Sequence, residues 1–140
     1  MTTRLIPYIQ FAGAAREAVT FYQEVFGGEL TISTFGDFGM PGADPSHVMH
    51  SELKADGFDL MGADGLEPDQ VVGETRISAA FMSDEVERVL GWFARLSDGG
   101  TVRQPLEKQV WGDMYGEVTD RFGVRWMFNV ALPGDDAPLA

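Results

Sequence analysis

The sequence predicts an α+β protein made of two consecutive β-α-β-β-β modules, at about residues 4–63 and 74–131. Each half contains apolar residues spaced three and four positions apart, as on one face of a helix, and this stretch ends at a Gly-Gly pair, Gly27-Gly28 or Gly99-Gly100. Short apolar or alternating stretches typical of strands precede and follow both helices. Residues 64–73 are rich in glycine, proline and acids, so we expect a linker between the modules there.

The first half begins with an apolar stretch that contains Pro7, which favours an edge strand because proline cannot donate to a sheet. Asp56-Gly57, between two apolar stretches, is typical of a tight hairpin turn. Residues 36–46 are rich in glycine and proline and are predicted to be a loop, either a lid over a ligand or a plain connector. The predicted elements are a strand at 5–11, a helix at 13–26 and strands at 30–35, 48–55 and 58–62.

In the second half, Ser83 precedes a stretch rich in acidic residues. This pattern favours a helix start, because a serine oxygen can accept from the first N–H groups and acids are stabilised near them. The predicted elements are a strand at 77–81, a helix that Ser83 caps and that ends at Gly99-Gly100, and strands at 101–104, 114–119 and 124–131, with a loop at 105–113 and a turn at 120–123. Residues 133–140 are predicted to be a tail.

A four-stranded sheet that carries one helix covers only one of its two faces. We therefore expect the two modules to pair into a curved mixed sheet that leaves an open cleft for a ligand. Strand residues that point away from the helices would line this cleft.

The chain has 140 residues, with 10 lysines and arginines against 22 aspartates and glutamates, and its formal net charge is −12. This charge repels phosphate backbones and anionic lipid surfaces, so neither nucleic acid nor a membrane is an expected partner. No apolar run approaches the roughly 20 residues needed to cross a bilayer, and we expect a cytoplasmic protein. The absence of cysteine excludes a thiolate nucleophile, a disulfide and a cysteine-based zinc site.

His50 and Glu52 alternate onto the same face of a predicted strand. They form either a solvated polar face or, joined by Asp64 or Asp113, part of a displaced metal site. Tyr8, Glu52, Asp64 and Asp113 are also candidates for acid/base chemistry, although their spacing does not distinguish any of them.

Trp111 and Tyr115 lie where a predicted loop enters a strand, and they either close a pocket or pack under the loop. In the last strand, Arg125, Met127 and Asn129 share one face. They form either the polar outer surface of the sheet or a wall suited to an organic ligand with an anionic or carbonyl group.

Several short strings occur in the following order: Pro7-Tyr8-Ile9, Phe21-Tyr22, Phe26-Gly27-Gly28, residues 50–53, Trp111-Gly112-Asp113, Asp120-Arg121-Phe122-Gly123 and Trp126. Together with the paired modules, they resemble the vicinal oxygen chelate superfamily, which contains glyoxalases, bleomycin-resistance proteins and dioxygenases, and within it the PhnB-like branch. The resemblance covers about residues 4–131. It implies a glyoxalase-like fold, a small organic ligand and a homodimer.

Members of this branch often carry the name of a demethylubiquinone methyltransferase. Such an enzyme uses a glycine-rich turn after its first strand to hold S-adenosylmethionine, whereas the first helix here opens with Gly13-Ala14-Ala15-Arg16. We therefore do not expect methyltransferase activity.

Metal-dependent members of the superfamily draw His and Glu ligands from inner-face positions of four strands. The resemblance puts three of these positions near Pro7, Met61 and Met127, and residues 71–90, which should hold another, contain no histidine. None of the three residue types binds a hard divalent cation, so we expect neither the usual metal nor another cofactor.

The preferred interpretation is a small-molecule-binding protein without the usual metal site, which either sequesters its ligand or acts as an enzyme. The alternative is a metal-dependent lyase, isomerase or dioxygenase with a rearranged site on His50 and Glu52. The acidic surface favours a cationic ligand, whereas Arg125 favours an anionic one. The predicted ligand-binding residues are His50, Glu52, Met61, Trp111, Tyr115, Arg125, Met127 and Asn129.

Overall fold

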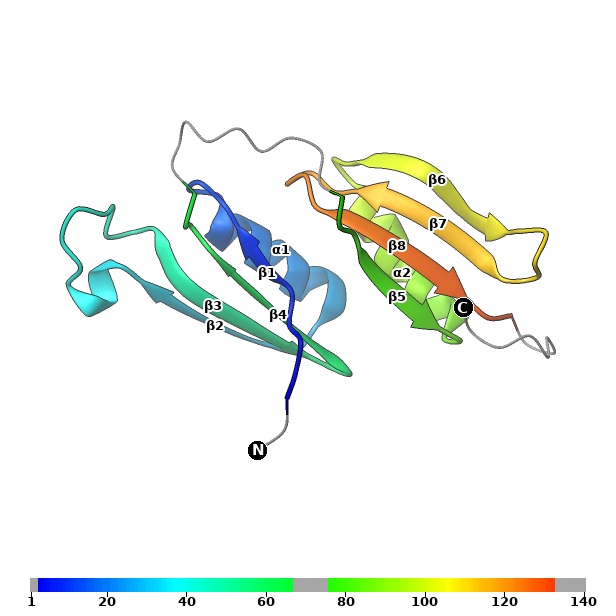
Figure 1. The fold of residues 1–140 in the computed structure, drawn as a ribbon, viewed down its shortest axis with the longest axis horizontal. Helices are drawn as coiled ribbons and strands as arrows, with labels where there is room; N and C mark the ends of the chain where they lie inside the picture. The colour runs from blue at the N-terminus through cyan, green and yellow to red at the C-terminus, as the bar shows by residue number, and fades with distance from the viewer. Residues whose placement is uncertain (1–2, 67–75, 133–140) are drawn as a thin grey trace. The chain divides into compact units, whose positions relative to one another are not determined.

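The computed structural model describes residues 3–66 and 76–132 and divides the chain into two compact units, Met1–Val72 and Gly73–Ala140 (Figure 1). The first unit contains β1 (Tyr8–Gln10), α1 (Ala15–Phe26), β2 (Glu29–Thr34), the short 3-10 helix η1 (Gly36–Phe38), β3 (Val48–Ala55) and β4 (Phe58–Ala63). The second contains β5 (Ala79–Ser83), α2 (Val86–Ser97), β6 (Thr101–Lys108), β7 (Met114–Thr119) and β8 (Arg125–Val130). The predicted α+β class and the repeated β-α-β-β-β order are confirmed.

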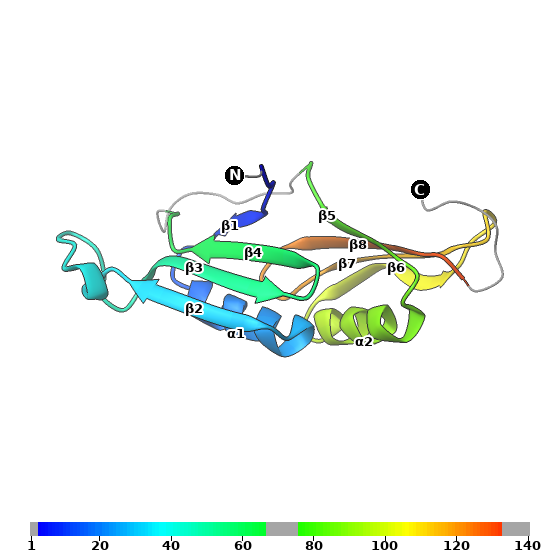
Figure 2. The ribbon, with the colours of Figure 1, turned by 90° about the horizontal axis from the view of Figure 1, so that it is seen from below.

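Each unit has one mixed four-stranded sheet, with strand order β1-β4-β3-β2 in the first and β5-β8-β7-β6 in the second. The first strand of each unit pairs in parallel with the last, and the other neighbours pair antiparallel. One helix covers one face of each sheet: α1 contacts β2, β3 and β4, and α2 contacts β6, β7 and β8 (Figure 2). Among the described residues, no helix of the same unit covers the other face of each sheet, and we call it the helix-free face.

The apolar side of each helix forms the core of its unit. In α1 the buried side chains include Tyr22 and Phe26, and Phe26 meets the ring of Phe58 from β4 edge to face. In α2, Phe93 contacts the ring of Phe128 from β8 in the same manner. Full burial of such a ring contributes roughly 1.5–3 kcal/mol, so these stripes hold each helix against its sheet.

The Gly-Gly pair at the end of each helix has a steric cause. The first glycine of each pair has a positive φ, 75° at Gly27 and 76° at Gly99, as is common where a helix ends. A Cβ on the second glycine would lie 2.2 Å from the carbonyl oxygen of Lys54 at Gly28 and 2.4 Å from that of Thr119 at Gly100. The same close approach of a strand to the helix end therefore occurs in both units.

Several predicted boundaries were wrong. The strand predicted at 5–11 is only Tyr8–Gln10, and the strand predicted at 77–81 is Ala79–Ser83. The strand predicted at 101–104 continues to Lys108, so the loop predicted at 105–113 is shorter. Pro105 fits inside β6 because this strand is at the edge of its sheet and its register shifts between Gln104 and Glu107.

Ser83 does not cap α2 directly, because it is the last residue of β5. Its hydroxyl accepts a hydrogen bond from the N–H of Glu85 at 3.0 Å, one residue before the helix begins. The predicted loop at 36–46 contains η1, where Asp37 accepts from the N–H of Thr34 and the Thr34 hydroxyl accepts from the N–H of Asp37. Most of the predicted linker and the whole predicted tail lie outside the described residues.

In the described parts of the chain, neither helix has the length and apolar character needed to cross a membrane.

Candidate functional site

The candidate residues of the first unit lie on its helix-free face. In β4, Phe58 and Gly62 face α1. Phe58 contacts the ring of Phe26, and a Cβ added at Gly62 would lie 3.2 Å from the side chain of Val19 in α1. Met61 therefore points to the other face, by the alternation of a strand. The sheet register places both Tyr8 of β1 and Glu52 of β3 beside Met61.

His50 lies two positions before Glu52, on the same face of β3. Its Nδ1 is 3.0 Å from the hydroxyl of Tyr8, and the two ring centroids are 5.7 Å apart. The carboxylate of Glu52 lies 3.5 Å from the ammonium of Lys54. His50, Glu52 and Met61 thus share one polar surface with Tyr8, and the side chains of His50 and Glu52 each have a neighbour within the unit.

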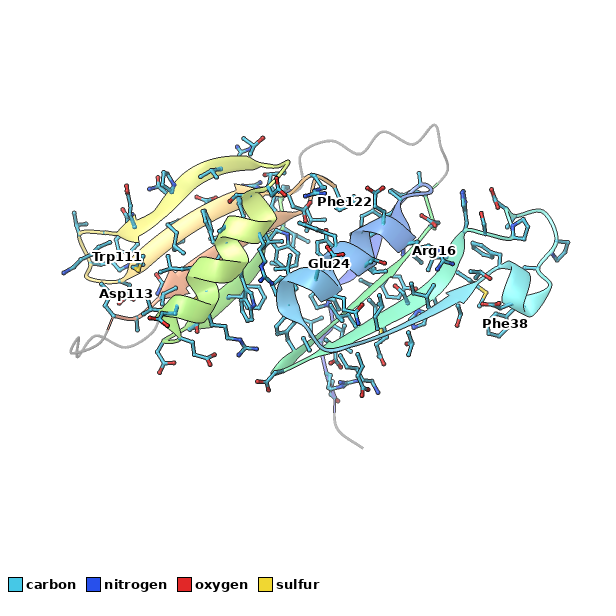
Figure 3. All side chains as sticks on the ribbon, turned by 180° about the vertical axis from the view of Figure 1, so that it is seen from behind. Arg16, Glu24, Phe38, Trp111, Asp113 and Phe122 are labelled. Carbon is cyan, nitrogen blue, oxygen red and sulfur yellow. The ribbon has the colours of Figure 1, made fainter. Side chains whose placement is uncertain are left out.

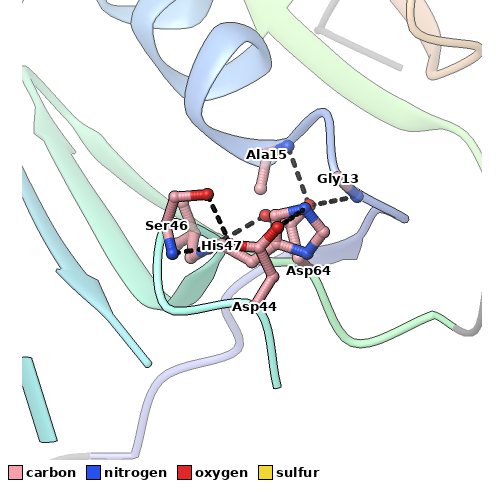
Figure 4. Close-up of polar contacts among 7 residues, drawn as sticks. Gly13, Ala15, Asp44, Ser46, His47 and Asp64 are labelled. Atoms are coloured by element: carbon pink, nitrogen blue, oxygen red, sulfur yellow. Dashed lines mark hydrogen bonds and ion pairs between the residues drawn. The ribbon is translucent and has the colours of Figure 1, made fainter. Parts of the chain in front are cut away.

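Asp64, proposed as a further ligand beside His50, is occupied by three backbone N–H groups. Its Oδ1 accepts from Gly13 at 2.7 Å and from Ala15 at 3.0 Å, and its Oδ2 accepts from Val48 at 2.9 Å (Figure 4). These bonds join the start of α1 to the start of β3, and the negative charge lies where the dipole of α1 favours it. Asp64 is therefore a structural residue rather than a metal ligand or an acid/base group.

The donor set does not fit the metal site that the superfamily implies. Tyr8, not Pro7, stands beside Met61 in the first unit, and Ala80 stands beside Met127 in the second. A phenol, a methyl group and two thioethers are poor ligands for a hard divalent cation. Within residues 3–66 and 76–132, no group of three or more His, Cys, Asp or Glu side chains is placed to hold a metal ion.

The second unit brings three candidates together on its helix-free face. Phe128 faces α2 through its contact with Phe93, so Met127 and Asn129 point away from that helix. The indole Nε1 of Trp111 donates to Asn129 Oδ1 at 3.4 Å. Tyr115 stands beside Asn129 in the register of β7 and β8.

Trp111 and Tyr115 form an edge-to-face pair with ring centroids 6.0 Å apart. Burial raises the pKa of the Tyr115 hydroxyl, and the charge of Glu117 and a hydrogen bond with it raise this pKa further, while Arg125 lowers it. A negative charge on the Tyr115 oxygen is thus disfavoured. Tyr115 therefore presents a neutral hydroxyl beside the ring of Trp111.

Arg125 lies near a carboxylate of its own sheet. Its Nη2 is 3.9 Å from Glu117 Oε1, and Glu117 stands beside Met127 in the register. The positive charge of Arg125, which favours an anionic ligand, is thus partly balanced by Glu117. Arg125 and Met127 share the helix-free face with Tyr115 and Asn129.

The sequence offers Asp113 only as an acid/base candidate and as a further ligand beside His50, but the structure joins it to Trp111 through Asn129. Asn129 Nδ2 donates to Asp113 Oδ2 at 2.9 Å. Both residues are buried. The sequence signal was the position of Asp113 between Trp111 and Tyr115, but the bond to Asn129 spans 16 positions and could not be read from spacing.

Comparisons with known proteins agree with this fold. Residues 4–128 match the Glyoxalase/Bleomycin resistance protein/Dioxygenase superfamily. Protein YjdN of Escherichia coli K12 is 29% identical over 139 residues, which cover 90% of this chain and 94% of YjdN. The crystal structure of PA1353 from Pseudomonas aeruginosa is 32% identical, with a TM-score of 0.83 over 94% of this chain and 99% of that one.

A PhnB protein structure from Bacillus cereus, whose description suggests a 3-demethylubiquinone-9 3-methyltransferase, shares the fold at 23% identity. Its TM-score is 0.76, over 92% of this chain and 100% of that one. The predicted family is confirmed by the match of residues 4–128 and by these folds. The chain belongs to the Glyoxalase/Bleomycin resistance protein/Dioxygenase superfamily, the vicinal oxygen chelate proteins.

Proposed function

We propose that this chain binds a small organic ligand on the helix-free faces of its sheets, without the divalent ion that metal-dependent relatives use. The observation that carries the proposal is the chemistry of Met61 and Met127, two positions to which the resemblance assigns metal ligands, together with their neighbours in the register, Tyr8 and Ala80. The proposed binding residues are His50, Glu52 and Met61 in the first unit and Trp111, Tyr115, Arg125, Met127 and Asn129 in the second.

The chemistry of the second unit supports an organic ligand. The side chain of Trp111 contacts the ring of Tyr115 and donates one long hydrogen bond to Asn129, and half of the residue is exposed. Exposing an indole to water is costly, and an aromatic ring beside a neutral phenol and an amide suits a ligand with both apolar and polar groups. Met127 adds a polarizable thioether to the same face.

The methyltransferase activity suggested for the Bacillus cereus protein is not part of this proposal. In this chain the N–H groups of Gly13 and Ala15, at the turn between β1 and α1, donate to Asp64. The turn therefore has no glycine-rich cradle of open N–H groups for S-adenosylmethionine.

The test combines metal analysis with a ligand screen. Protein purified without a metal-affinity step should contain no stoichiometric divalent metal by inductively coupled plasma mass spectrometry. In a thermal-shift screen in EDTA, a ligand at 100 times its dissociation constant should stabilise the fold by about 2.7 kcal/mol.

The variant His50→Ala separates this proposal from a rearranged metal site on His50 and Glu52. Stoichiometric metal that is lost in His50→Ala, together with ligand binding that EDTA abolishes, would replace the proposal with the metal-dependent alternative. The matched control is His47→Ala, because His47 lies beside Asp44 at 3.6 Å and is not among the proposed binding residues.

The proposal also includes a cytoplasmic homodimer in which modules 4–63 and 74–131 form one glyoxalase-like domain, joined by a linker at 64–73. The resemblance to the superfamily supports the dimer. Light scattering at micromolar concentration should give twice the chain mass of 15.3 kDa. A monomeric mass would contradict the dimer without affecting the ligand proposal.

A further inference from the structure

Asp113 is a buried carboxylate that its own unit satisfies only in part. The residue is 2% exposed, and its Oδ2 accepts from Asn129 Nδ2 at 2.9 Å. Its Oδ1 is buried and has no hydrogen-bond partner among the described residues, and no described Lys, Arg or His pairs with it. Buried carboxylates are normally paired or fully hydrogen-bonded, because an unpartnered charged oxygen away from water is costly.

A chain of hydrogen bonds leads from Asp113 to the surface. An indole N–H can only donate and a carboxylate can only accept, so the amide of Asn129 is fixed with its oxygen toward Trp111 and its nitrogen toward Asp113. The outer member, Trp111, is 50% exposed and lies at the same end of the second unit as Asp113 (Figure 3). The Trp111 bond is long, 3.4 Å, and therefore weak.

The surroundings of this chain are aromatic, thioether and acidic. Tyr115 meets the ring of Trp111 edge to face, and Met82 of β5, itself 48% exposed, stands beside Asn129 in the register. Glu107 of β6 stands beside Tyr115. Aromatic rings together with a carboxylate form the kind of site that holds an organic ammonium group in proteins.

We propose that the ligand of this face is a protonated organic amine, whose N–H donates to Asp113 Oδ1 while its carbon skeleton packs on Trp111 and Tyr115. This inference rests on the proposed function and names its ligand class. The bond from Trp111 to Asn129 is long and weak, so the indole can move to accommodate the ligand at little cost. The ligand then supplies both the donor and the positive charge that Asp113 lacks within the described chain.

The overall charge supports this choice over an anion. The chain carries a net charge of −12, which draws cations toward its surface and repels carboxylates. Arg125, a cation on this face, already lies near Glu117. A quaternary ammonium has the charge but no N–H, so it would leave Asp113 Oδ1 unpartnered and should bind less tightly than a primary amine.

The test is a titration with four probes of similar shape: benzylamine, benzyltrimethylammonium, benzyl alcohol and benzoate. Binding is followed by the NMR signals of the Trp111 indole N–H and the Asn129 side-chain amide in the full chain. We expect benzylamine to bind at least tenfold more tightly than the other three. This comparison needs no variant, so it holds even if a substitution at Asp113 disturbs folding.

The affinity for benzylamine should fall at least tenfold in Asp113→Asn. The control is Glu87→Gln, which removes one exposed charge from α2 and should keep the affinity within twofold of that of the original chain. Equal benzylamine binding by Asp113→Asn and the original chain would mean that a buried water satisfies Oδ1, and it would overturn the inference. Tighter binding of benzoate or benzyl alcohol, or no shift at Trp111 with any probe, would overturn it as well. Different results would contradict the proposed function: ligand binding that depends on a metal, or a ligand screen in which no compound binds.

Discussion

Two carboxylates at strand ends, Asp64 in the first unit and Asp113 in the second, are bonded in contrasting ways. Asp64 directly follows β4 and accepts from three backbone N–H groups, whereas Asp113 directly precedes β7 and accepts from one side-chain amide. Asp64 is half-buried, while Asp113 is buried with one oxygen unpartnered among the described residues. The contrast separates an acid that holds the fold together from the acid to which we assign the proposed ligand.

Asp120 of the second unit shows that burial alone does not make this difference. It is buried like Asp113, but its Oδ1 accepts from the N–H groups of Phe122 and Val124 and its Oδ2 accepts from the indole of Trp126. A buried acid with this many donors stabilises a turn, and we class Asp120 with Asp64. Substitutions of Asp120, Asp64 and Asp113 test this division of the acids, and a fourth prediction concerns the neighbouring Tyr115.

The largest effect is expected for Asp120→Ala. It leaves two backbone N–H groups and the buried indole N–H of Trp126 without an acceptor, so the free energy of unfolding should fall by about 3 kcal/mol. Urea unfolding followed by tryptophan fluorescence measures the loss. Asp120→Asn retains one acceptor oxygen and should lose less stability than Asp120→Ala. A loss below about 1 kcal/mol in Asp120→Ala would contradict the grouping of Asp120 with the structural acids.

A somewhat smaller loss, about 2 kcal/mol, is expected for Asp64→Ala. The three N–H groups that donate to Asp64 become unsatisfied, but water can reach part of this half-buried site. Hydrogen exchange should speed up at Gly13, Ala15 and Val48. The control is Asp44→Asn, on an exposed turn where Asp44 accepts from Ser46, and it should leave exchange at those three positions unchanged.

Asp113→Asn should behave in the opposite way to the two alanine variants. The amide oxygen can still accept from Asn129, and the substitution removes a buried charge with no described counter-charge. Urea unfolding should show stability unchanged or raised by about 1 kcal/mol. A loss of 2 kcal/mol or more would place Asp113 with the structural acids.

The smallest effect concerns the hydroxyl of Tyr115, beside the proposed ligand face. Burial first, and then the charge of Glu117 and a hydrogen bond with it, raise its pKa above the ordinary value of 10.0. The unfolded chain therefore loses this proton first, so the contribution of Tyr115 to stability is fully present below pH 10.0 and declines as the pH rises above that value.

Absorbance titration at alkaline pH, compared with Tyr115→Phe to identify its signal, gives the pKa of Tyr115. Glu117→Gln removes the negative neighbour and should lower this pKa toward its ordinary value. An unchanged pKa in Glu117→Gln would show that Glu117 does not act on this face.

The sequence predicted the fold better than the bonds within the site. Apolar spacing predicted both helices, Asp56-Gly57 marked the hairpin between β3 and β4, and the Gly-Gly pairs marked the repeat. Pro105 was misread as the end of a strand, because nothing local shows that β6 is an edge strand with an irregular register.

The acids show why the site was harder to predict than the fold. The sequence predicts Asp64 in the linker and as a candidate metal ligand, because its donors at Gly13 and Ala15 are 51 and 49 positions away in the chain. Asp113 was left out of the predicted ligand-binding residues, because its partner Asn129 lies on another strand. His50, Glu52 and Met61 do share one face, since alternation and a tight hairpin determine that locally.

The central claim, that an organic ligand binds this chain without a divalent ion, is tested most directly at Trp111. A hit from the ligand screen should be titrated in EDTA and again with added Mn²⁺, while the indole N–H signals of Trp92, Trp111 and Trp126 are followed by NMR. We predict that the Trp111 signal shifts to saturation in EDTA with the same dissociation constant as with Mn²⁺, while those of the buried Trp92 and Trp126 stay in place. Binding that occurs only with Mn²⁺, or that leaves Trp111 unshifted, would contradict the account.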